Sequence, residues 1–475
     1  MKLLLNLPRV DLPGPPPALG FRLPNLLRFF RDPVGHLVEL HGRYGDVVAL
    51  TAGDPTWVAV RGADRLRTLL SDAVRFQNLA DSPIPVPKGS APEVLFGQAV
   101  TALNGADHKR ARRLMMPVFS KGAVASYHDE VVGTIERVLA AWPASGVVDV
   151  AAVTLDLALQ IALSSLFGVP SGAQAAEIAR LSQAFLDGVL SMGVMMFPAD
   201  LPGTPYRRWI RECQAYEALL RGLVADRRAN PQPRRDVLST LIAARDEDGS
   251  QLVETELVAH GAVLLTASHE TTANTLAWTL FLLAAHPEVQ DAVADSLKGL
   301  GAPSVAQLAG LTLLDQVVKE SQRLLPASCI LFFREATAPF ALDGRELPAG
   351  TRLLTSPYVA HRDPTLFPEP QRFRPARWDA LEPGPYAFMP FGAGPRLCIG
   401  AQFATQAVRL ALAAILQRYR FDIAPGCRVD RHVRGITLGP KAGIRLTLRP
   451  RDAAPGPGAG IAGDIHALVD GLPRA

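Results

Sequence analysis

The sequence predicts a mainly α-helical chain with small β-sheets (α+β) that folds as one large domain. Helical periodicity continues from about residue 123 to 245, an apolar segment of helical length covers 255–285, and a strongly amphipathic segment covers 399–418. Short alternating apolar runs bounded by turn residues occur near both ends of the chain. Long helical patterns and only a few short strand patterns together favour this fold class.

The composition is that of a globular protein with a sizeable core. Of the 475 residues, 48% are hydrophobic and 20% are charged, and the formal net charge is +4. No dense basic block is present, so nucleic acid is not an expected partner. The four cysteines form no CxxC pair, which disfavours a disulfide framework and fits a reducing, cytoplasmic location; they are Cys213, Cys329, Cys398 and Cys427.

No segment predicts a transmembrane anchor. The apolar start of the chain ends at Pro8 and is too short for a signal peptide or a bilayer span. The longest apolar stretch, 257–285, carries His269 and Glu270 near its centre, where ionisable groups would be costly in lipid. We therefore expect a buried helix there.

The N-terminal part begins with a Pro-rich lead-in at 1–20, which we expect to precede a main domain of residues 21–450. A helix is predicted from about Pro33 to Tyr44, and two apolar runs at 47–50 and 57–60 predict a hairpin.

Residues 78–103 contain four prolines and two glycines and predict a long functional loop, such as a lid or a pocket wall. Asn104 is placed to cap the helix that follows. On that helix His108 and Arg112 share one face, because four residues separate them. Spacing alone favours a solvated basic face.

Four or five helices with short connections are predicted between 123 and 245. One connection, 191–197, holds three of the seven methionines. Methionine adapts to irregular shapes. The segment therefore suits a pocket for a flexible apolar ligand, although an ordinary corner of the core explains it as well.

The long helix at 255–285 would extend roughly 45 Å, and Pro287 is placed to start the next helix. A polar run at 267–274 interrupts its apolar surface. Buried polar groups are costly unless they are satisfied or used, and satisfied groups are the default. A further helix at 311–324 carries Glu320 and Arg323 at a spacing that allows a local pair.

The last part of the chain alternates short strands with turns before and after the amphipathic helix. A small sheet is predicted from 340–342, 346–347 and 351–354, and two later runs at 421–423 and 444–448 close a sheet. We expect residues 451–475 to form a flexible C-terminal tail.

The stretch from Phe391 to Gly400 predicts a metal-binding cysteine. Backbone N–H groups at the start of the following helix favour a thiolate at Cys398, and Gly394 and Gly400 leave room for a large planar group. Arg396 offers a cation for a carboxylate, and Phe391 can shield the sulfur from water.

These residues resemble the haem-thiolate signature of the cytochrome P450 superfamily, Phe-x-x-Gly-x-Arg-x-Cys-x-Gly. Three further motifs support the resemblance over roughly residues 21–450: Glu320-x-x-Arg323, the run 373–378 with Arg377, and the run 267–272 on the long helix. The resemblance implies a single P450-type domain of the soluble bacterial type, with haem b between the long central helix and the helix after Cys398.

The resemblance also implies roles for particular residues. Cys398 would bind the haem iron, and Glu270 and Thr271 would carry protons. His108, Arg112, Arg334 and Arg396 would bind the haem propionates, with Phe391 and Gly400 beside the macrocycle. Glu320, Arg323 and Arg377 would form a structural triad.

The activity implied is that of a monooxygenase, which inserts one oxygen atom from O2 into a hydrophobic small molecule by hydroxylation or epoxidation. Electrons would come from a ferredoxin or flavodoxin with its reductase, and Lys109, Arg110 and Arg113 would form a docking surface for such an acidic protein. Two alternatives stay open: a haem-thiolate sensor or carrier that does not oxidise its ligand, and a peroxide-driven oxygenase or isomerase.

The substrate pocket, by the same resemblance, would draw on five segments with few charges: 78–103, 191–197, 260–271, 326–332 and 435–439. Such a pocket fits a fatty-acyl, terpenoid, steroid-like or polyketide compound. The sequence departs from the family pattern at Ser268, where glycine is usual, and at Ala376 and Trp378, where we expect a change in local packing only. The Ser268 hydroxyl is expected to bond back to the carbonyl four residues earlier or to narrow the oxygen groove.

Overall fold

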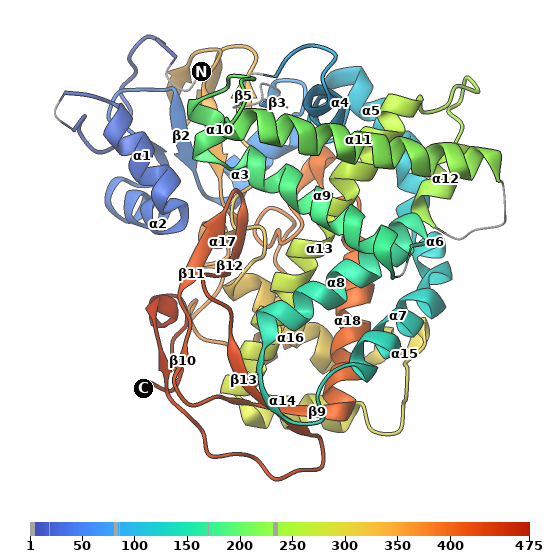
Figure 1. Ribbon diagram of the computed structural model, residues 1–475. Coiled ribbons are helices and arrows are strands. Elements are labelled where there is room, and N and C mark those ends of the chain that lie inside the picture. The colour runs from blue at the N-terminus through green and yellow to red at the C-terminus, as the bar shows by residue number, and fades with distance from the viewer. Residues whose placement is uncertain (1–4, 19, 80–83, 85, 170, 231–235) are drawn as a thin grey trace.

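The computed structural model describes residues 5–18, 20–79, 84, 86–169, 171–230 and 236–475. Within these residues helices predominate, and the strands form small sheets at the margins (Figure 1). The α-helices are α1 (Leu23–Arg31), α2 (Pro33–Tyr44), α3 (Ala63–Ser71), α4 (Ala91–Gly97), α5 (Gly105–Met115), α6 (Lys121–Ser126), α7 (His128–Ala140), α8 (Val150–Phe167), α9 (Ala173–Val189), α10 (Met192–Met196), α11 (Pro205–Ala229), α12 (Val237–Ala243), α13 (Glu254–Ala285), α14 (Pro287–Ser296), α15 (Val305–Gly310), α16 (Thr312–Leu324), α17 (Pro357–Ala360) and α18 (Ala401–Arg418).

The strands are short, as the sequence predicts. They are β1 (Val47–Ala49), β2 (Trp57–Val60), β3 (Phe76–Asn78), β4 (Gly146–Asp149), β5 (Arg334–Ala336), β6 (Phe340–Leu342), β7 (Arg345–Leu347), β8 (Arg352–Thr355), β9 (Tyr419–Ile423), β10 (Cys427–Arg428), β11 (Arg431–Arg434), β12 (Thr437–Pro440), β13 (Arg445–Pro450) and β14 (Ile461–Ala462). Single 3₁₀ turns lie at η1 (Met116–Phe119), η2 (Pro375–Asp379), η3 (Gly394–Arg396) and η4 (Asp464–Ala467).

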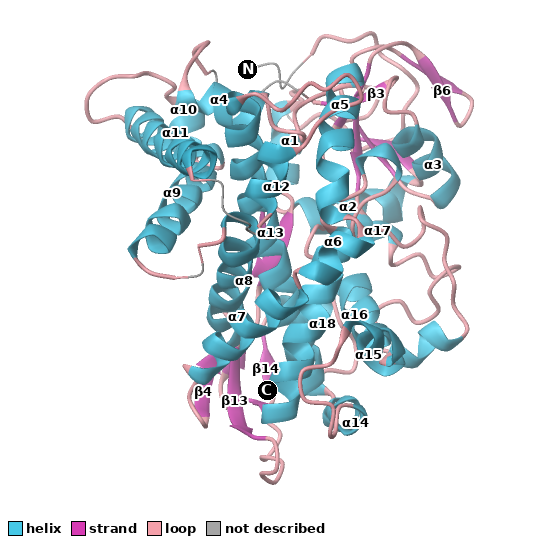
Figure 2. Cartoon of the chain, turned by 90° about the vertical axis from the view of Figure 1, so that its right-hand side faces the viewer, coloured by secondary structure: helices cyan, strands magenta, loops and turns pink. Residues whose placement is uncertain are grey.

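Helix α13 is the centre of the fold. Its side chains from Leu276 to Leu283 are almost completely buried, and it packs against α4, α8, α11, α16 and α18. Figure 2 shows α13, α8 and α18 running side by side through the middle of the molecule. The predicted long helix is confirmed, and Pro287 begins α14 as expected, because the first turn of a helix needs no N–H from that position.

The main sheet joins the two halves of the chain. Strands β1 and β2 form the predicted antiparallel hairpin. Strand β8 then pairs with β2 in parallel, and the strand order is β1-β2-β8-β5-β3. The expectation that 340–354 forms one small sheet is wrong, because β6 and β7 pair only with each other while β8 enters the main sheet.

The helical middle of the chain is more divided than predicted. The described residues of 123–245 contain six complete helices, α7 to α12, and the end of α6, rather than four or five helices. The predicted loop at 78–103 holds strand-end residue Asn78 and helix α4, whose Leu95 is buried. The Pro92 position explains α4, since proline fits the first turn of a helix. Of that loop, residues 80–83 and 85 lie outside the described residues.

Both ends of the chain pack onto the domain. In the lead-in, the carbonyls of Pro13 and Pro15 accept hydrogen bonds from the N–H groups of Ala49 and Ala52, at 2.8 Å each. The C-terminal residues differ from the flexible tail that we expected, because β14 pairs with β10. The apolar side chains that follow are buried, and they are Ile465, Leu468, Val469 and Leu472.

Helix α8 is, in the described part of the chain, the one helix long and apolar enough to cross a membrane by length and composition. The fold buries 61% of it, and it lies along α13. Packing in the core accounts for its apolar sequence.

Candidate active site

The loop of residues 389–400, here called the Cys398 loop, is held by its own backbone. The N–H of Cys398 donates to the Phe391 carbonyl at 2.9 Å, and the N–H of Gly392 donates to the Met389 carbonyl at 3.0 Å. Gly394 has φ +69°, and a Cβ there would lie 2.2 Å from the Leu70 carbonyl oxygen. The close approach of α3 therefore requires glycine at this position.

Gly400 stands at the start of α18 with a normal φ of −88°. A Cβ built there would meet no atom within 4 Å, so the space beside this backbone is open.

The Cys398 thiol is accessible although the loop lies within the fold. It is the one exposed cysteine among the four. Burial by surrounding protein raises its pKa, while the Gly400 N–H and the Arg112 guanidinium act to lower it. The backbone at the start of α18 thus lowers the pKa of the Cys398 thiol as expected, but the opposing effect of burial is larger. A metal cation at the sulfur would reverse this balance.

Three arginines from distant parts of the chain converge near His108. Arg112 on α5 donates to the Leu397 carbonyl at 2.7 Å and so ties α5 to the Cys398 loop. Arg396 donates to Oδ1 of Asn104 at 2.6 Å, and Arg334 on β5 donates to Oδ1 of Asn78. The backbone N–H of Asn78 also donates a hydrogen bond to Oδ1 of Asn104 at 3.0 Å. The expected capping role of the Asn104 side chain is therefore wrong; it holds an arginine instead.

The cluster of Arg112, Arg334 and Arg396 is not neutralised by protein. None of the three forms an ion pair with a carboxylate of the described residues, and the Nε atoms of Arg334 and Arg396 are buried without a hydrogen-bond partner. Burial and these three positive charges lower the pKa of His108 to about 4, so its ring is neutral at pH 7.

These residues fit a haem. Its two propionate carboxylates match this group of buried and half-buried guanidiniums, two of which are positioned by asparagine side chains that do not cancel their charge. The accessible Cys398 sulfur and the open side of Gly400 lie in the adjoining loop. The four residues His108, Arg112, Arg334 and Arg396, predicted from separate segments, are brought together.

Helix α13 has an accessible stripe in its otherwise buried middle. Ala267 is exposed, and Val263, Ser268 and Thr271 are half-buried on the same face. The Thr271 hydroxyl donates to the Ala267 carbonyl at 2.7 Å, which leaves its oxygen free to accept a hydrogen bond. The Ser268 hydroxyl donates to the Leu265 carbonyl at 3.1 Å, three residues earlier rather than four.

Glu270 has a partner that sequence reasoning missed. Nη1 of Arg434, on β11, lies 3.7 Å from Oε1 of Glu270, and the same guanidinium forms an ion pair with Asp187 on α9. Arg434 adjoins the predicted pocket segment 435–439, but nothing in its sequence context indicates which acid it meets.

The predicted triad is present and has a fourth member. Nε and Nη2 of Arg323 donate to the two oxygens of Glu320 at 2.9 Å each, and Nε of Arg377 donates to Oε1 at 2.9 Å. The indole of Trp378 donates to Oε2 at 3.1 Å. Our expectation that Trp378 changes only packing is wrong.

A histidine connects this network to the Cys398 loop. Arg323 donates to the His361 carbonyl at 3.1 Å, and Nε2 of His361 accepts the N–H of Met389 at 2.9 Å. Burial is the main cause that lowers the pKa of His361 to about 3, so its ring stays neutral and can accept. The triad therefore supports the loop, as the resemblance implied.

The basic face of α5 is largely neutralised. Arg113 binds both oxygens of Asp246, at 2.6 and 2.8 Å, and Arg110 donates to Glu256 at 2.8 Å. Lys109 is exposed. The prediction that Lys109, Arg110 and Arg113 form a basic docking surface therefore fails for the two arginines.

The structure brings two of the predicted pocket segments into direct contact and packs helix α4 of a third against α13. The Cys329 N–H donates to the Ile436 carbonyl at 3.0 Å, which joins 326–332 to 435–439. A Cβ on Gly435 would lie 3.4 Å from Leu190. From 78–103, α4 packs against α13, and Phe96 lies 4.6 Å from Phe185 between ring centroids.

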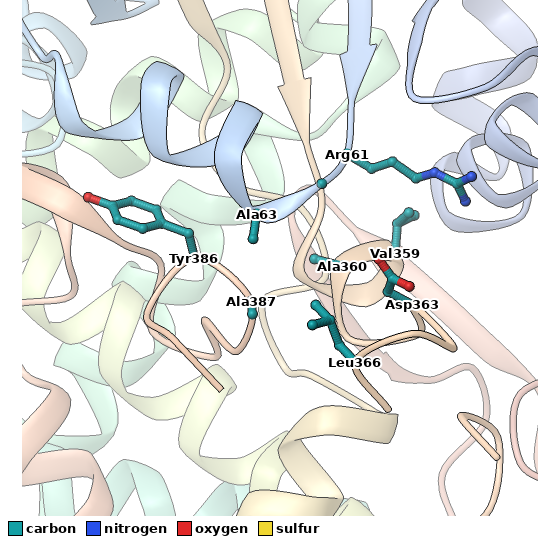
Figure 3. A pocket seen from close by; sticks show the side chains of 9 residues that line it. Arg61, Ala63, Val359, Ala360, Asp363, Leu366, Tyr386 and Ala387 are labelled. Atoms are coloured by element: carbon teal, nitrogen blue, oxygen red, sulfur yellow. The ribbon is translucent and has the colours of Figure 1, made fainter. Parts of the chain in front are cut away.

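A small pocket elsewhere in the fold contains none of the predicted site residues. Figure 3 shows its lining from β2, α3, α17 and the following loops: Arg61, Ala63, Val359, Ala360, Asp363, Leu366, Tyr386 and Ala387. Its charged groups already have partners, since Arg61 pairs with Asp46 and Asp363 accepts the N–H of Thr365.

Comparison with known proteins gives a consistent result. The family model described as Cytochrome P450 matches residues 13–445. The chain is 32% identical to cyclooctatin synthase of Streptomyces melanosporofaciens, over 92% of this chain and 95% of that protein. It is 30% identical to cyclooctat-9-en-7-ol 5-monooxygenase of the same organism, over 87% and 90%. The solved structure of retinoic acid-bound cyanobacterial CYP120A1 has the same fold, with a TM-score of 0.79 at 23% identity over 92% of this chain and 100% of that one.

Proposed function

This chain belongs to the cytochrome P450 family of haem monooxygenases, and we propose that it uses haem b to insert one oxygen atom of O2 into a terpenoid substrate. The observation that carries the haem assignment is the cluster of buried Arg334 with half-buried Arg112 and Arg396, which lacks a protein carboxylate among the described residues. It adjoins an accessible cysteine, Cys398.

The cofactor and the chain divide the work. The haem supplies the binding and reductive activation of dioxygen, and thiolate ligation by Cys398 favours cleavage of the O–O bond. His108, Arg112, Arg334 and Arg396 would hold its carboxylates, and Phe391 and Gly400 would line its thiolate side. One substrate, one dioxygen, two electrons and two protons give one hydroxylated product and one water. The chain must therefore deliver two protons to the oxygen atom that leaves as water.

Glu270 and Thr271 are the groups we assign to proton delivery. Thr271 lies on the accessible stripe of α13, with its hydroxyl hydrogen already donated to Ala267. Its oxygen would accept a hydrogen bond from water near the reacting dioxygen. Glu270, next to it and half-buried, would give a proton to that water and regain one from solvent.

The substrate class follows from the pocket segments and from the relatives. The five predicted pocket segments hold few charges, and Phe332 in one of them is half-exposed, which supports a hydrocarbon ligand. One relative is named as a 5-monooxygenase of cyclooctat-9-en-7-ol, an unsaturated alcohol by its name. A terpenoid is therefore the proposed choice among the apolar classes.

The remaining parts of the proposal concern electron supply and location. Electrons would come from a ferredoxin or flavodoxin with its reductase. The reduced thiols and the similarity to bacterial relatives favour the cytoplasm.

The test uses the purified haem-loaded protein with a surrogate ferredoxin and reductase. A terpenoid panel is screened first by shifts of the haem absorption band, and binders are then assayed for oxygenated product under labelled O2. One labelled oxygen atom in the product supports the proposal. Product without label, product only with added peroxide, or band shifts without any product would overturn it in favour of the alternative haem functions.

A further inference from the structure

We propose that Arg434 is a positioning residue that couples helix α9 to proton delivery by Glu270. In the described state Asp187 draws the guanidinium toward α9; when α9 moves away, Arg434 closes on Glu270 and immobilises its carboxylate. The inference rests on the proposed function, because Glu270 must be a proton carrier for the coupling to matter.

One guanidinium here faces two carboxylates at unequal distance. Arg434 is in direct contact with Oδ1 of Asp187, whereas its Nη1 lies 3.7 Å from Oε1 of Glu270, beyond hydrogen-bond distance. The two contacts use different nitrogens of one rigid, planar guanidinium, Nη2 for Asp187 and Nη1 for Glu270, and its contact with Asp187 leaves Nη1 short of Glu270. Asp187 therefore competes with Glu270 for Arg434.

The Arg434 backbone is fixed relative to α13. The β11–β12 hairpin is joined to residues 327–329 through the N–H of Leu438, which donates to the Ala327 carbonyl at 2.8 Å. The Leu438 carbonyl accepts the indole N–H of Trp278, on α13, at 3.1 Å. The backbone of Arg434 therefore holds a fixed position relative to α13, and only its side chain needs to move to reach Glu270.

Asp187 lies in the last turn of α9, near Leu190 and the short helix α10. Figure 1 shows this end of α9 above the β11–β12 hairpin. The other partner of the Asp187 carboxylate is Gln183, on the same helix, at 2.9 Å. Among the described residues, Arg434 is thus the only side chain from another element that binds Asp187, and a shift of α9 would break this ion pair first.

The exposure of the three side chains gives the coupling a direction. The Asp187 side chain is 58% exposed, that of Arg434 27% and that of Glu270 20%. Exposure therefore decreases from Asp187 at the surface, through Arg434, to Glu270, which precedes Thr271 on α13. With Asp187 in place, the Glu270 carboxylate can turn between solvent and the interior; with Asp187 withdrawn, it is held by Arg434. Proton delivery is then restricted to the state in which α9 is docked.

Opposite effects of two substitutions test the coupling. Asp187→Asn keeps the shape but releases Arg434 to Glu270, so product formed per NADH should fall by about fivefold, the low end of energetic couplings between sites. The solvent deuterium isotope effect on turnover should rise. Arg434→Gln should leave product per NADH at or above the starting value, and the double variant should behave like Arg434→Gln. Asp200→Asn, an exposed acid that faces Arg207, is the matched control.

A second readout does not depend on turnover. Hydrogen exchange at the α9 amides near Asp187 should accelerate in both single variants, because each removes the same ion pair. The inference would be overturned if product per NADH fell equally in Asp187→Asn and Arg434→Gln. It would also be overturned if hydrogen exchange of the α9 amides were unchanged in both variants. A parent protein that forms no oxygenated product would instead overturn the proposed function, so the two failures are distinct.

Discussion

The indole Nε1 of Trp378 donates a hydrogen bond to Oε2 of Glu320 at 3.1 Å. Glu320 and Arg323 are both fully buried, so every donor to this carboxylate offsets the cost of its removal from water. Removing one donor leaves the carboxylate less satisfied, and the half-buried ring keeps its packing against Phe388, with 4.6 Å between ring centroids.

Trp378→Phe should therefore lower the free energy of unfolding by about 2 kcal/mol, as expected for a hydrogen bond to a buried charge. Chemical unfolding followed by circular dichroism measures it. Trp142→Phe is the control, since Trp142 is also half-buried and stacks on Tyr419. Equal losses in the two variants would mean that ring packing, not the hydrogen bond, stabilises the site.

Arg334→Gln should separate haem binding from protein stability. The three guanidiniums repel one another, so removing one should leave the haem-free protein as stable or more stable. Loss of a charged donor to a carboxylate should speed haem transfer to an acceptor protein by roughly tenfold. Arg352→Gln is the control, because Arg352 is equally buried but pairs with Glu335; it should destabilise both forms alike. The assignment would be contradicted if the haem-bound Arg334→Gln protein melted at a higher temperature than the haem-bound parent while the haem-free forms melted alike.

The residues that the sequence predicted well are those whose role is written in a short local pattern. Glu320 and Arg323, which pair as expected, are three residues apart on one helix. Long helices such as α13 also follow from periodicity, because 3.6-residue spacing is local.

The missed features join side chains that are far apart in the chain. Arg434 meets Glu270 at a separation of 164 positions in the chain, and Asn104 meets Arg396 at a separation of 292. Such pairs depend on how helices and hairpins pack, which no window of sequence contains. The C-terminal residues were misjudged for the same reason, since β14 finds its partner β10 across a Pro- and Gly-rich connection that by itself suggests disorder.

Thr271→Ala and Ser268→Gly form a matched pair on α13. Both hydroxyls donate to backbone carbonyls of their own helix, but only Thr271 is assigned to proton delivery. Thr271→Ala should lower product per NADH several-fold with little change in stability, because alanine favours helix. Ser268→Gly should retain turnover and lose about 1 kcal/mol of stability. Unchanged coupling in Thr271→Ala would contradict its role, and lost turnover in Ser268→Gly would show that the serine is required.

Ile465→Ala tests the docked C-terminus. Ile465 is fully buried in the main core, and Arg362 donates to the nearby Leu468 carbonyl at 3.1 Å and to the Leu324 carbonyl of α16. The cavity left by the substitution should cost about 3 kcal/mol. The midpoint of chemical unfolding measures it, with Ala467→Ser, at an exposed position of the same turn, as the control. A change below about 0.5 kcal/mol, typical of surface sites, would show that this segment is loosely attached.

His260→Leu should make the protein more resistant to acid. The ring is fully buried, and neither nitrogen has a hydrogen-bond partner among the described residues. Burial, with a smaller effect of Arg110, lowers its pKa from 6.5 to about 4. Between these values the unfolded chain binds a proton that the folded chain does not. Stability from the neutral ring is therefore present above pH 6.5 and lost as pH falls toward 4, by up to about 3 kcal/mol.

Leucine has nearly the same volume and cannot be protonated, so the acid midpoint should move to lower pH while stability at pH 7.5 stays equal or rises. The measurement is equilibrium unfolding by urea at a series of pH values from 7.5 to 4.5. His432→Leu is the control, because it makes the same substitution at an exposed position on β11. If His260→Leu leaves that slope unchanged, the His260 ring takes up no more protons in the unfolded chain than in the fold, and its burial does not limit acid stability.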